Sequence, residues 1–135
     1  MSHVEYASAD AGRSSPLDAA LYVRRTLRAG QRVAHDGDVI VLGDVHAGAE
    51  IRAAGDVLVF GNLRGVVHAG AEGSEAAVVC AWRLNPVQLR IGPLIARSPD
   101  EHEASPDVPE MARIEHGQVV IERLVDRTMG GWLRG

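Results

Sequence analysis

The feature that most constrains this fold is a nine-residue pattern that returns 18 residues later. Segment 37–45 reads Gly-Asp-Val-Ile-Val-Leu-Gly-Asp-Val, segment 55–63 reads Gly-Asp-Val-Leu-Val-Phe-Gly-Asn-Leu, and all nine positions match in kind. A finer period of six is marked by the apolar residues Val33, Val39, Val45, Ile51, Val57, Leu63 and Ala69. A helix repeats about every 3.6 residues and a single strand every two, so neither explains this period.

A coil with three short strands per turn explains both periods. Each side of the coil is one strand followed by a bend, and the residues at period six point inward and stack on their counterparts in the next turn. The glycines at 37, 43, 55 and 61 then mark bends. We therefore predict an all-β fold, a three-sided parallel β-helix with about 18 residues per turn.

The repeat is interrupted at Gly73-Ser74-Glu75, because the charged Glu75 falls where an inward residue is due. We expect a loop there that shifts the register, and strands near 77–82 and 87–91 that resume the coil. Further on, apolar and polar residues alternate on both sides of His116-Gly117, which is typical of a β-hairpin. Since the end of a coil exposes apolar core, we expect this C-terminal hairpin to act as a cap.

Composition divides the remaining parts of the chain. The first residues are small and polar, which favours disorder, and a later acidic stretch rich in proline indicates an exposed loop. The expected organisation is a disordered N-terminal segment at 1–25, a β-helix domain at 26–97, an acidic Pro-containing loop at 98–110, C-terminal strands at 111–125 and a tail of unassigned structure at 126–135.

One side of the predicted coil is apolar on both faces. If Val39 and Val41 point inward, their strand neighbours point outward, and with the next turn they form an apolar patch of Ile40, Leu42, Leu58 and Phe60. Burying one such side chain contributes about 1.5–3 kcal/mol, so we expect the patch to be covered. An identical chain in a two-fold homodimer is the favoured cover, and the C-terminal hairpin is the alternative. The other two sides carry polar outward residues, Asp44 and His46 on one and Glu50 and Arg52 on the next.

Composition also removes several classes of function. The net charge of −4 gives no reason to expect nucleic acid or an anionic membrane as a partner. All 14 basic residues are arginine, so Schiff-base and P-loop lysines are impossible. Cys80 is the only cysteine and lies in an apolar run, as a buried structural thiol would, and the six histidines show no zinc-site spacing. We expect no catalytic residue, no metal and no cofactor, and hence no enzyme.

Two other classes of protein share the 18-residue period. Hexapeptide-repeat acyltransferases are three-sided coils that use a histidine as general base. They usually have more turns than this sequence predicts, since its repeat pattern accounts for about three and a half turns. Bactofilin-like structural β-solenoids polymerise end to end, which a broken third turn and a terminal cap would oppose. The period alone does not separate these classes.

Several segments resemble one family in the same order along the chain. Arg-Thr-Leu-Arg-Ala-Gly-Gln-Arg-Val at 25–33 resembles the R-S-G-Q stretch that opens the C-terminal domain of MinC, a bacterial division-site inhibitor. Segments 38–45 and 48–50 resemble the next part of that domain, and 59–65 and 69–71 the part after it. The similarity runs from about residue 24 to 94, and more weakly to 124.

The resemblance implies a right-handed β-helix that forms homodimers, binds the membrane-associated ATPase MinD and helps to block FtsZ ring assembly at wrong sites. The family's MinD contact lies at the R-S-G-Q stretch, which Arg28, Gly30 and Gln31 match while Ala29 replaces the serine. Gly48 follows Gly30 by one turn, which suggests two small residues along an edge that a partner's backbone can approach.

For FtsZ, the resemblance implies a contact at Arg64 and Gly65, although Val66 stands where the family often has a second basic residue. Members of the family also carry an N-terminal domain, which is the stronger inhibitor of FtsZ. In this sequence about 25 residues precede the coil, which are too few for such a domain. We therefore expect weak inhibition of FtsZ by this chain alone. With no long apolar stretch or signal peptide in the sequence, we expect a cytoplasmic protein, recruited to the inner face of the membrane only through MinD.

Overall fold

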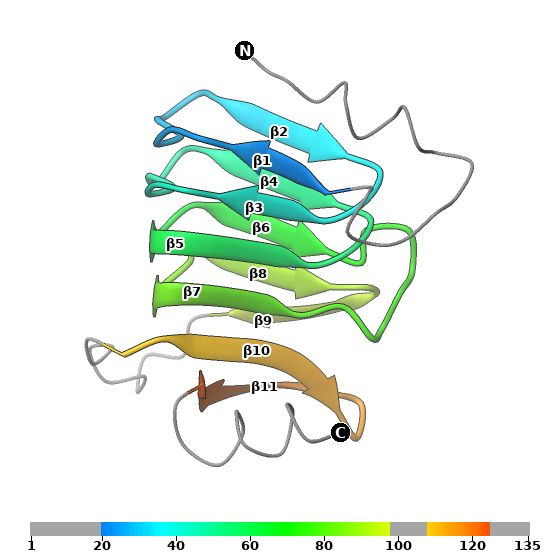
Figure 1. The fold of residues 1–135 in the computed structure, drawn as a ribbon. Coiled ribbons are helices and arrows are strands. Elements are labelled where there is room, and N and C mark those ends of the chain that lie inside the picture. Colours follow the sequence, from blue (N-terminus) through cyan, green and yellow to red (C-terminus); the bar gives the residue numbers. More distant parts are fainter. Residues whose placement is uncertain (1–19, 98–107, 125–135) are drawn as a thin grey trace.

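The computed structural model describes residues 20–97 and 108–124, which form stacked turns of β-strand (Figure 1). The strands of this described part are β1 (Leu21–Val23), β2 (Arg32–His35), β3 (Val39–Val41), β4 (Glu50–Ala53), β5 (Val57–Leu63), β6 (Val66–Ala69), β7 (Val79–Leu84), β8 (Gln88–Ile91), β9 (Leu94–Arg97), β10 (Glu110–Glu115) and β11 (Gln118–Arg123). They confirm the predicted parallel β-helix.

Two sheets form two sides of the coil. Sheet A has the order β1-β3-β5-β7-β10-β11, and sheet B has the order β2-β4-β6-β8-β9. The third side is reduced to single bridges that join Leu27 to Val45 and Val45 to Leu63. Side chains from all three sides meet in one core, in which Leu27, Val39 and Ile51 are almost fully buried.

The first turns follow the predicted period of 18. Val39 pairs with Val57 in sheet A, and Val33 pairs with Ile51 in sheet B. Equivalent inward residues therefore stack directly on one another, so every turn repeats the same small set of core contacts.

The third turn departs from that period at the corner between β5 and β6. Ile51 pairs with Val67, 16 residues later, where the period of six places Ala69. Ala69 still points inward and is fully buried, but it lies two residues further along the strand. The chain recovers in the segment before β7, since Val57 pairs with Val79, 22 residues later. The corner at Gly65 thus makes the spacing between turns two residues shorter than the period of 18. The predicted loop around the exposed Glu75 then makes the next spacing longer, so the strands stay in line.

Two strands lie where the sequence predicted none. β1 lies within the segment 1–25, for which disorder was expected, and adds an edge strand to sheet A by pairing in parallel with β3. β9 folds back on β8 through a turn at Gly92-Pro93 and closes the far edge of sheet B. The expectations for residues 1–19, for 98–107 within the acidic loop and for the tail at 126–135 lie outside the described residues.

The predicted hairpin is confirmed as β10 and β11. His116 and Gly117 both have positive φ, 53° and 77°, as a tight two-residue hairpin turn requires. β10 pairs antiparallel with β7, so the hairpin continues sheet A beyond the last parallel turn. Ala112 is fully buried there against the core, which makes the hairpin the expected cap.

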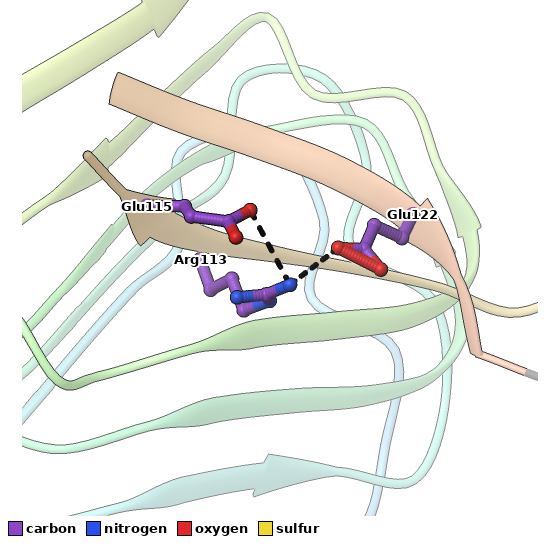
Figure 2. Close-up of polar contacts among 3 residues, drawn as sticks. All are labelled: Arg113, Glu115 and Glu122. Carbon is purple, nitrogen blue, oxygen red and sulfur yellow. Dashed lines mark hydrogen bonds and ion pairs between the residues drawn. The ribbon is translucent and has the colours of Figure 1, made fainter. Parts of the chain in front are cut away.

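An ion-paired cluster stabilises the outer face of this hairpin. Figure 2 shows the Arg113 guanidinium between Glu115 of its own strand and Glu122 of β11. The guanidinium also donates a hydrogen bond to the Glu122 carboxylate.

Aspartates of the nine-residue pattern hold successive turns together at the bends. Asp38 Oδ1 accepts a hydrogen bond from the Asp56 amide at 2.8 Å, and Asp56 Oδ1 accepts one from the Val78 amide at 2.9 Å. Asp44 Oδ1 accepts one from the Asn62 amide at 2.8 Å. Each carboxylate therefore reaches the next turn, Asp38 and Asp44 across 18 residues and Asp56 across 22, after the loop that lengthens the third turn.

Asp56 provides a test of this ladder that depends on pH. Burial raises the pKa of its carboxyl, and the charge of Asp38 adds to that effect, while the bond from the Val78 amide opposes it. When the pKa of a group is higher in the folded state than in the unfolded state, the protonated group stabilises the fold. This contribution is fully present at low pH and is lost as pH rises through the folded-state pKa. The ionised carboxylate therefore weakens the fold at neutral pH.

We predict that Asp56→Asn, which keeps the Oδ1 acceptor but not the charge, is at least as stable as the parent at pH 7, and that its advantage shrinks as pH falls toward about 4. Asp56→Ala should instead lose about 1–3 kcal/mol, because the Val78 amide is left unpaired. Urea unfolding at several pH values measures both. Equal losses for the two variants at pH 7 would show that the charge itself is needed.

Candidate partner-binding site

Two stacked tight turns form one corner of the coil, and we call residues 28–31 and 46–49 the glycine corner. The Gln31 amide donates to the Arg28 carbonyl at 3.0 Å, and the Ala49 amide donates to the His46 carbonyl at 3.0 Å. The third residue of each turn is a glycine with positive φ, 87° at Gly30 and 94° at Gly48, as in a type II turn. The Gly30 amide donates to the Gly48 carbonyl at 2.9 Å, which joins the two turns.

The Gln31 side chain fixes the shape of the upper turn. Its Oε1 accepts hydrogen bonds from the Arg28 amide at 2.8 Å and from the Arg25 guanidinium at 3.3 Å. The Gln31 carbonyl in turn accepts from the Glu50 amide. Gln31 is therefore a residue that holds the corner in place, while the exposed surface of the corner comes from Arg28, Ala29 and Gly30.

Gly48 and Gly65 are required by close packing. A Cβ at Gly48 would lie 3.0 Å from the Cβ of Ala29, the residue that replaces the expected serine. A Cβ at Gly65 would lie 2.4 Å from the Ala49 carbonyl oxygen, and Gly65 is buried directly beneath the glycine corner. Of the predicted pair Arg64 and Gly65, Arg64 is thus the one with an exposed side chain.

The structure places Arg64 and Arg28 in one column. The His46 amide donates to the Leu27 carbonyl, and the Arg64 amide donates to the Val45 carbonyl, so Arg28, His46 and Arg64 occupy the same position in successive turns. The two predicted contact regions are therefore parts of one edge. The three residues are 18 apart in the sequence, so the period could have placed them in one column. The sequence analysis predicted only that the His46 side chain points outward and did not include it in a contact region.

The predicted apolar patch lies on the outer face of sheet A. Leu42 is 44% exposed and Phe60 is 49% exposed, while Ile40 and Leu58, two residues earlier along the chain, are partly buried. Two aromatic residues that the sequence did not assign to it enlarge the patch: Tyr22 pairs with Ile40, and the ring of Trp82 stacks on Phe60 with centroids 5.1 Å apart. We call the enlarged set the sheet A patch: Tyr22, Ile40, Leu42, Leu58, Phe60 and Trp82.

The alternative prediction, that the C-terminal hairpin covers the patch, is wrong for the part of the hairpin that the structure describes. β10 and β11 extend sheet A sideways and do not fold over its outer face (Figure 1). Backbone hydrogen bonds from β10 to β7 and from β11 to β10 keep the hairpin in the plane of the sheet, so Leu42 and Phe60 remain exposed.

Cys80 lies on the same face, paired with Leu58 and Met111. Burial, with a smaller effect from the charge of Asp56, raises the pKa of its thiol to about 12. A thiol that stays protonated at neutral pH is a poor nucleophile, and Cys80 is only partly buried on this outer face, where the sequence predicted a buried thiol. Within 20–97 and 108–124, no group of three potential ligands is arranged to hold a metal ion. No helix in those ranges is long and apolar enough to span a membrane.

The two kinds of glycine at this site should respond differently to alanine. Gly30→Ala meets no atom within 4 Å and only has to adopt a positive φ, so we expect a loss of about 1 kcal/mol. Gly65→Ala drives a methyl group into backbone oxygen and should lose about 3 kcal/mol or more. Urea unfolding measures both, and a Gly65→Ala variant as stable as Gly30→Ala would show that the corner is not tightly packed.

Comparison with known proteins gives a consistent result. Residues 21–124 match the family model described as septum formation inhibitor MinC, C-terminal domain. Probable septum site-determining protein MinC of Heliobacterium modesticaldum is 55% identical over 103 residues, which are 76% of this chain and 36% of that protein. The corresponding protein of Persephonella marina is 50% identical over 102 residues, 76% of this chain and 51% of that protein. The chain thus spans about half or less of the length of these relatives.

A solved structure shares both the fold and the sequence pattern. It is a chain of the MinC:MinD cell division protein complex of Aquifex aeolicus, 41% identical, with a TM-score of 0.76 over 85% of this chain and 96% of that chain. The match of the family model over most of the described coil, together with these relatives, shows that the chain belongs to the MinC family through its C-terminal domain.

Proposed function

We propose that this chain is a cell-division regulator that binds the ATPase MinD through its glycine corner, as a homodimer, and helps to block FtsZ assembly at wrong sites. The observation that carries the proposal is the 41% identity to a chain solved as part of a MinC:MinD complex, with 96% of that chain covered. The regions proposed for the two contacts, the glycine corner and the sheet A patch, are both partly exposed.

The chemistry of the glycine corner supports a protein contact. Gly30 has no atom within 4 Å of the place where a Cβ would be, so a partner's backbone can approach it closely. Arg28 is exposed beside it, and a guanidinium offers a planar fork that suits a carboxylate. Gln31 pre-organises this surface through its bonds to Arg28 and Arg25, so less conformational entropy is lost on binding.

The sheet A patch supports the homodimer. It contains three aromatic residues, which are enriched in the cores of interfaces, on a flat face that a two-fold axis can bring against its own copy. The patch and the glycine corner lie on different parts of the coil, so the two contacts can form together. The chain then acts without catalysis, in the cytoplasm and at the inner membrane surface through MinD, and Arg64 is the candidate for a contact with FtsZ.

The MinD contact is tested by Gly30→Asp and Arg28→Ala. Neither change touches the core, so both variants should fold and dimerise, but ATP-dependent co-sedimentation with MinD-coated liposomes should fall at least about tenfold, as loss of a charged hydrogen bond implies. Arg123→Ala, at an exposed arginine on the hairpin, is the matched control and should bind as the parent does. If the corner variants also co-sediment normally, the contact lies elsewhere.

The dimer is tested by Phe60→Asp, which places a charge in the centre of the sheet A patch. Light scattering should give a dimer for the parent and a folded monomer for the variant, because an unpaired charge in a dry interface is strongly unfavourable. Val87→Asp makes the same change at another exposed apolar residue and should remain dimeric. A parent chain that is monomeric at micromolar concentration would contradict the assignment.

A further inference from the structure

Three basic residues stand in one column on the outer face of sheet B, away from both surfaces described above. Arg52 of β4 pairs with His68 of β6, and His68 pairs with Arg90 of β8. Each alternates with buried neighbours along its strand, so all three side chains face outward. We call this set the basic column, and it continues to the exposed Ile95 of β9, which pairs with Arg90.

His68 separates the two arginines as a neutral group. Its Nε2 lies 3.0 Å from the Gly92 carbonyl oxygen and must therefore donate, which leaves Nδ1 to accept from the Arg52 guanidinium at 3.5 Å. Burial lowers the pKa of His68, the hydrogen bond to the Gly92 carbonyl opposes this, and the charges of Arg90 and Arg52 act in the same direction as burial. The imidazole thus orients Arg52 and adds no charge of its own at neutral pH.

The two guanidiniums lack carboxylate partners within the described part of the chain. Arg90 Nε is buried and without a hydrogen-bond acceptor there, which is unfavourable for a charged group. The acidic residue nearest in the strand to Arg52 is Glu50, and its carboxylate is already paired with Arg32 at 3.0 Å. A guanidinium without a carboxylate partner favours an anion from outside, because a charge-assisted hydrogen bond is stronger than a neutral one.

The spacing of the column suggests what kind of anion fits. Strands in a sheet are about 4.8 Å apart, so the backbone positions of Arg52 and Arg90 are separated by about 9.6 Å. A polyproline II peptide presents the same face every third residue, about 9.3 Å along its axis. Acidic side chains at positions i and i+3 of such a peptide would therefore each reach one guanidinium.

The two ends of the column would meet different parts of such a peptide, and the carboxylates Asp36 and Glu72 beside Arg52 would repel any further acidic side chain, so the peptide's carboxylates are confined to the column itself. An open hollow of about 280 Å³ adjoins Arg52 and is lined by Ala34, His35, Asp36, Arg52, Ala54, Ala71 and Glu72. The exposed Ile95 at the other end offers an apolar surface. The net charge of the chain is −4, so a short local contact is favoured over a long polyanion such as nucleic acid.

We propose that the basic column is a docking surface for an acidic, extended peptide of a partner protein, with two carboxylates three residues apart bound by Arg52 and Arg90 and an apolar side chain next to Ile95. This surface is additional to the proposed MinD and dimer contacts and does not depend on them. A peptide bound there would lie across the strands of sheet B and parallel to the axis of the coil.

The test uses the full chain and a fluorescent synthetic peptide, Asp-Pro-Pro-Glu-Pro-Leu, in an anisotropy titration at low salt. We expect saturable binding that weakens at least about tenfold for Arg52→Gln and for Arg90→Gln, as the loss of a charge-assisted bond implies. Arg123→Gln makes the same charge change on the hairpin and should bind as the parent does. Binding should also be lost for the neutral peptide Asn-Pro-Pro-Gln-Pro-Leu.

Four results would overturn the proposal. Equal binding of the neutral peptide, or unchanged binding by both column variants, would show that the column does not read carboxylates. Binding of inorganic phosphate at the column with the same affinity as the peptide would indicate a phosphate site. If the parent binds no peptide but a variant with Asp100→Asn and Glu103→Gln does, the chain's own acidic segment occupies the column.

Discussion

The stacking of each turn of backbone on the next is the constraint on which the rest of this structure depends. Parallel ladders join β1, β3, β5 and β7 on one side and β2, β4, β6 and β8 on another, so each residue is held at a fixed height above its counterpart. Inward residues such as Val39, Val57 and Val79 are fully buried in consequence. Outward residues must also fall into columns, and the surfaces that we assign to partners are such columns.

The short corner at Gly65 limits the number of stacked turns in the glycine corner. Because the chain passes from β5 to β6 without a third glycine turn, the glycine corner consists of two turns that rest on a buried Gly65. Arg64 then continues the edge below them in line with Arg28 and His46. A partner that covers this edge would meet backbone at the glycines and charge at the arginines.

Sequence analysis predicted the parts of the fold that obey the period. The core columns, the apolar side, the hairpin around His116-Gly117 and the stacked Gly30 and Gly48 all follow from spacings of six or 18 or from local alternation. β1 was missed because three residues are too few to show a period. Trp82 was missed because it joins Phe60 only through the register shift after β5.

The basic column was hidden for the same reason. Arg52, His68 and Arg90 are 16 and 22 residues apart, so no constant period connects them, although each step is one strand of sheet B. The compensating loop before β7 brings them into line. Irregular spacing in a repeat can therefore create a surface that pattern analysis alone does not find.

The central claim is that MinD covers the glycine corner of this coil. Amide hydrogen exchange of the chain, with and without ATP-bound MinD, tests it most directly, because exposed amides at a contact exchange more slowly when covered. The account predicts new protection in peptides that cover residues 28–31 and 46–49, with no change across 88–97 of sheet B. Protection confined to sheet B, with the glycine corner unchanged, would contradict it.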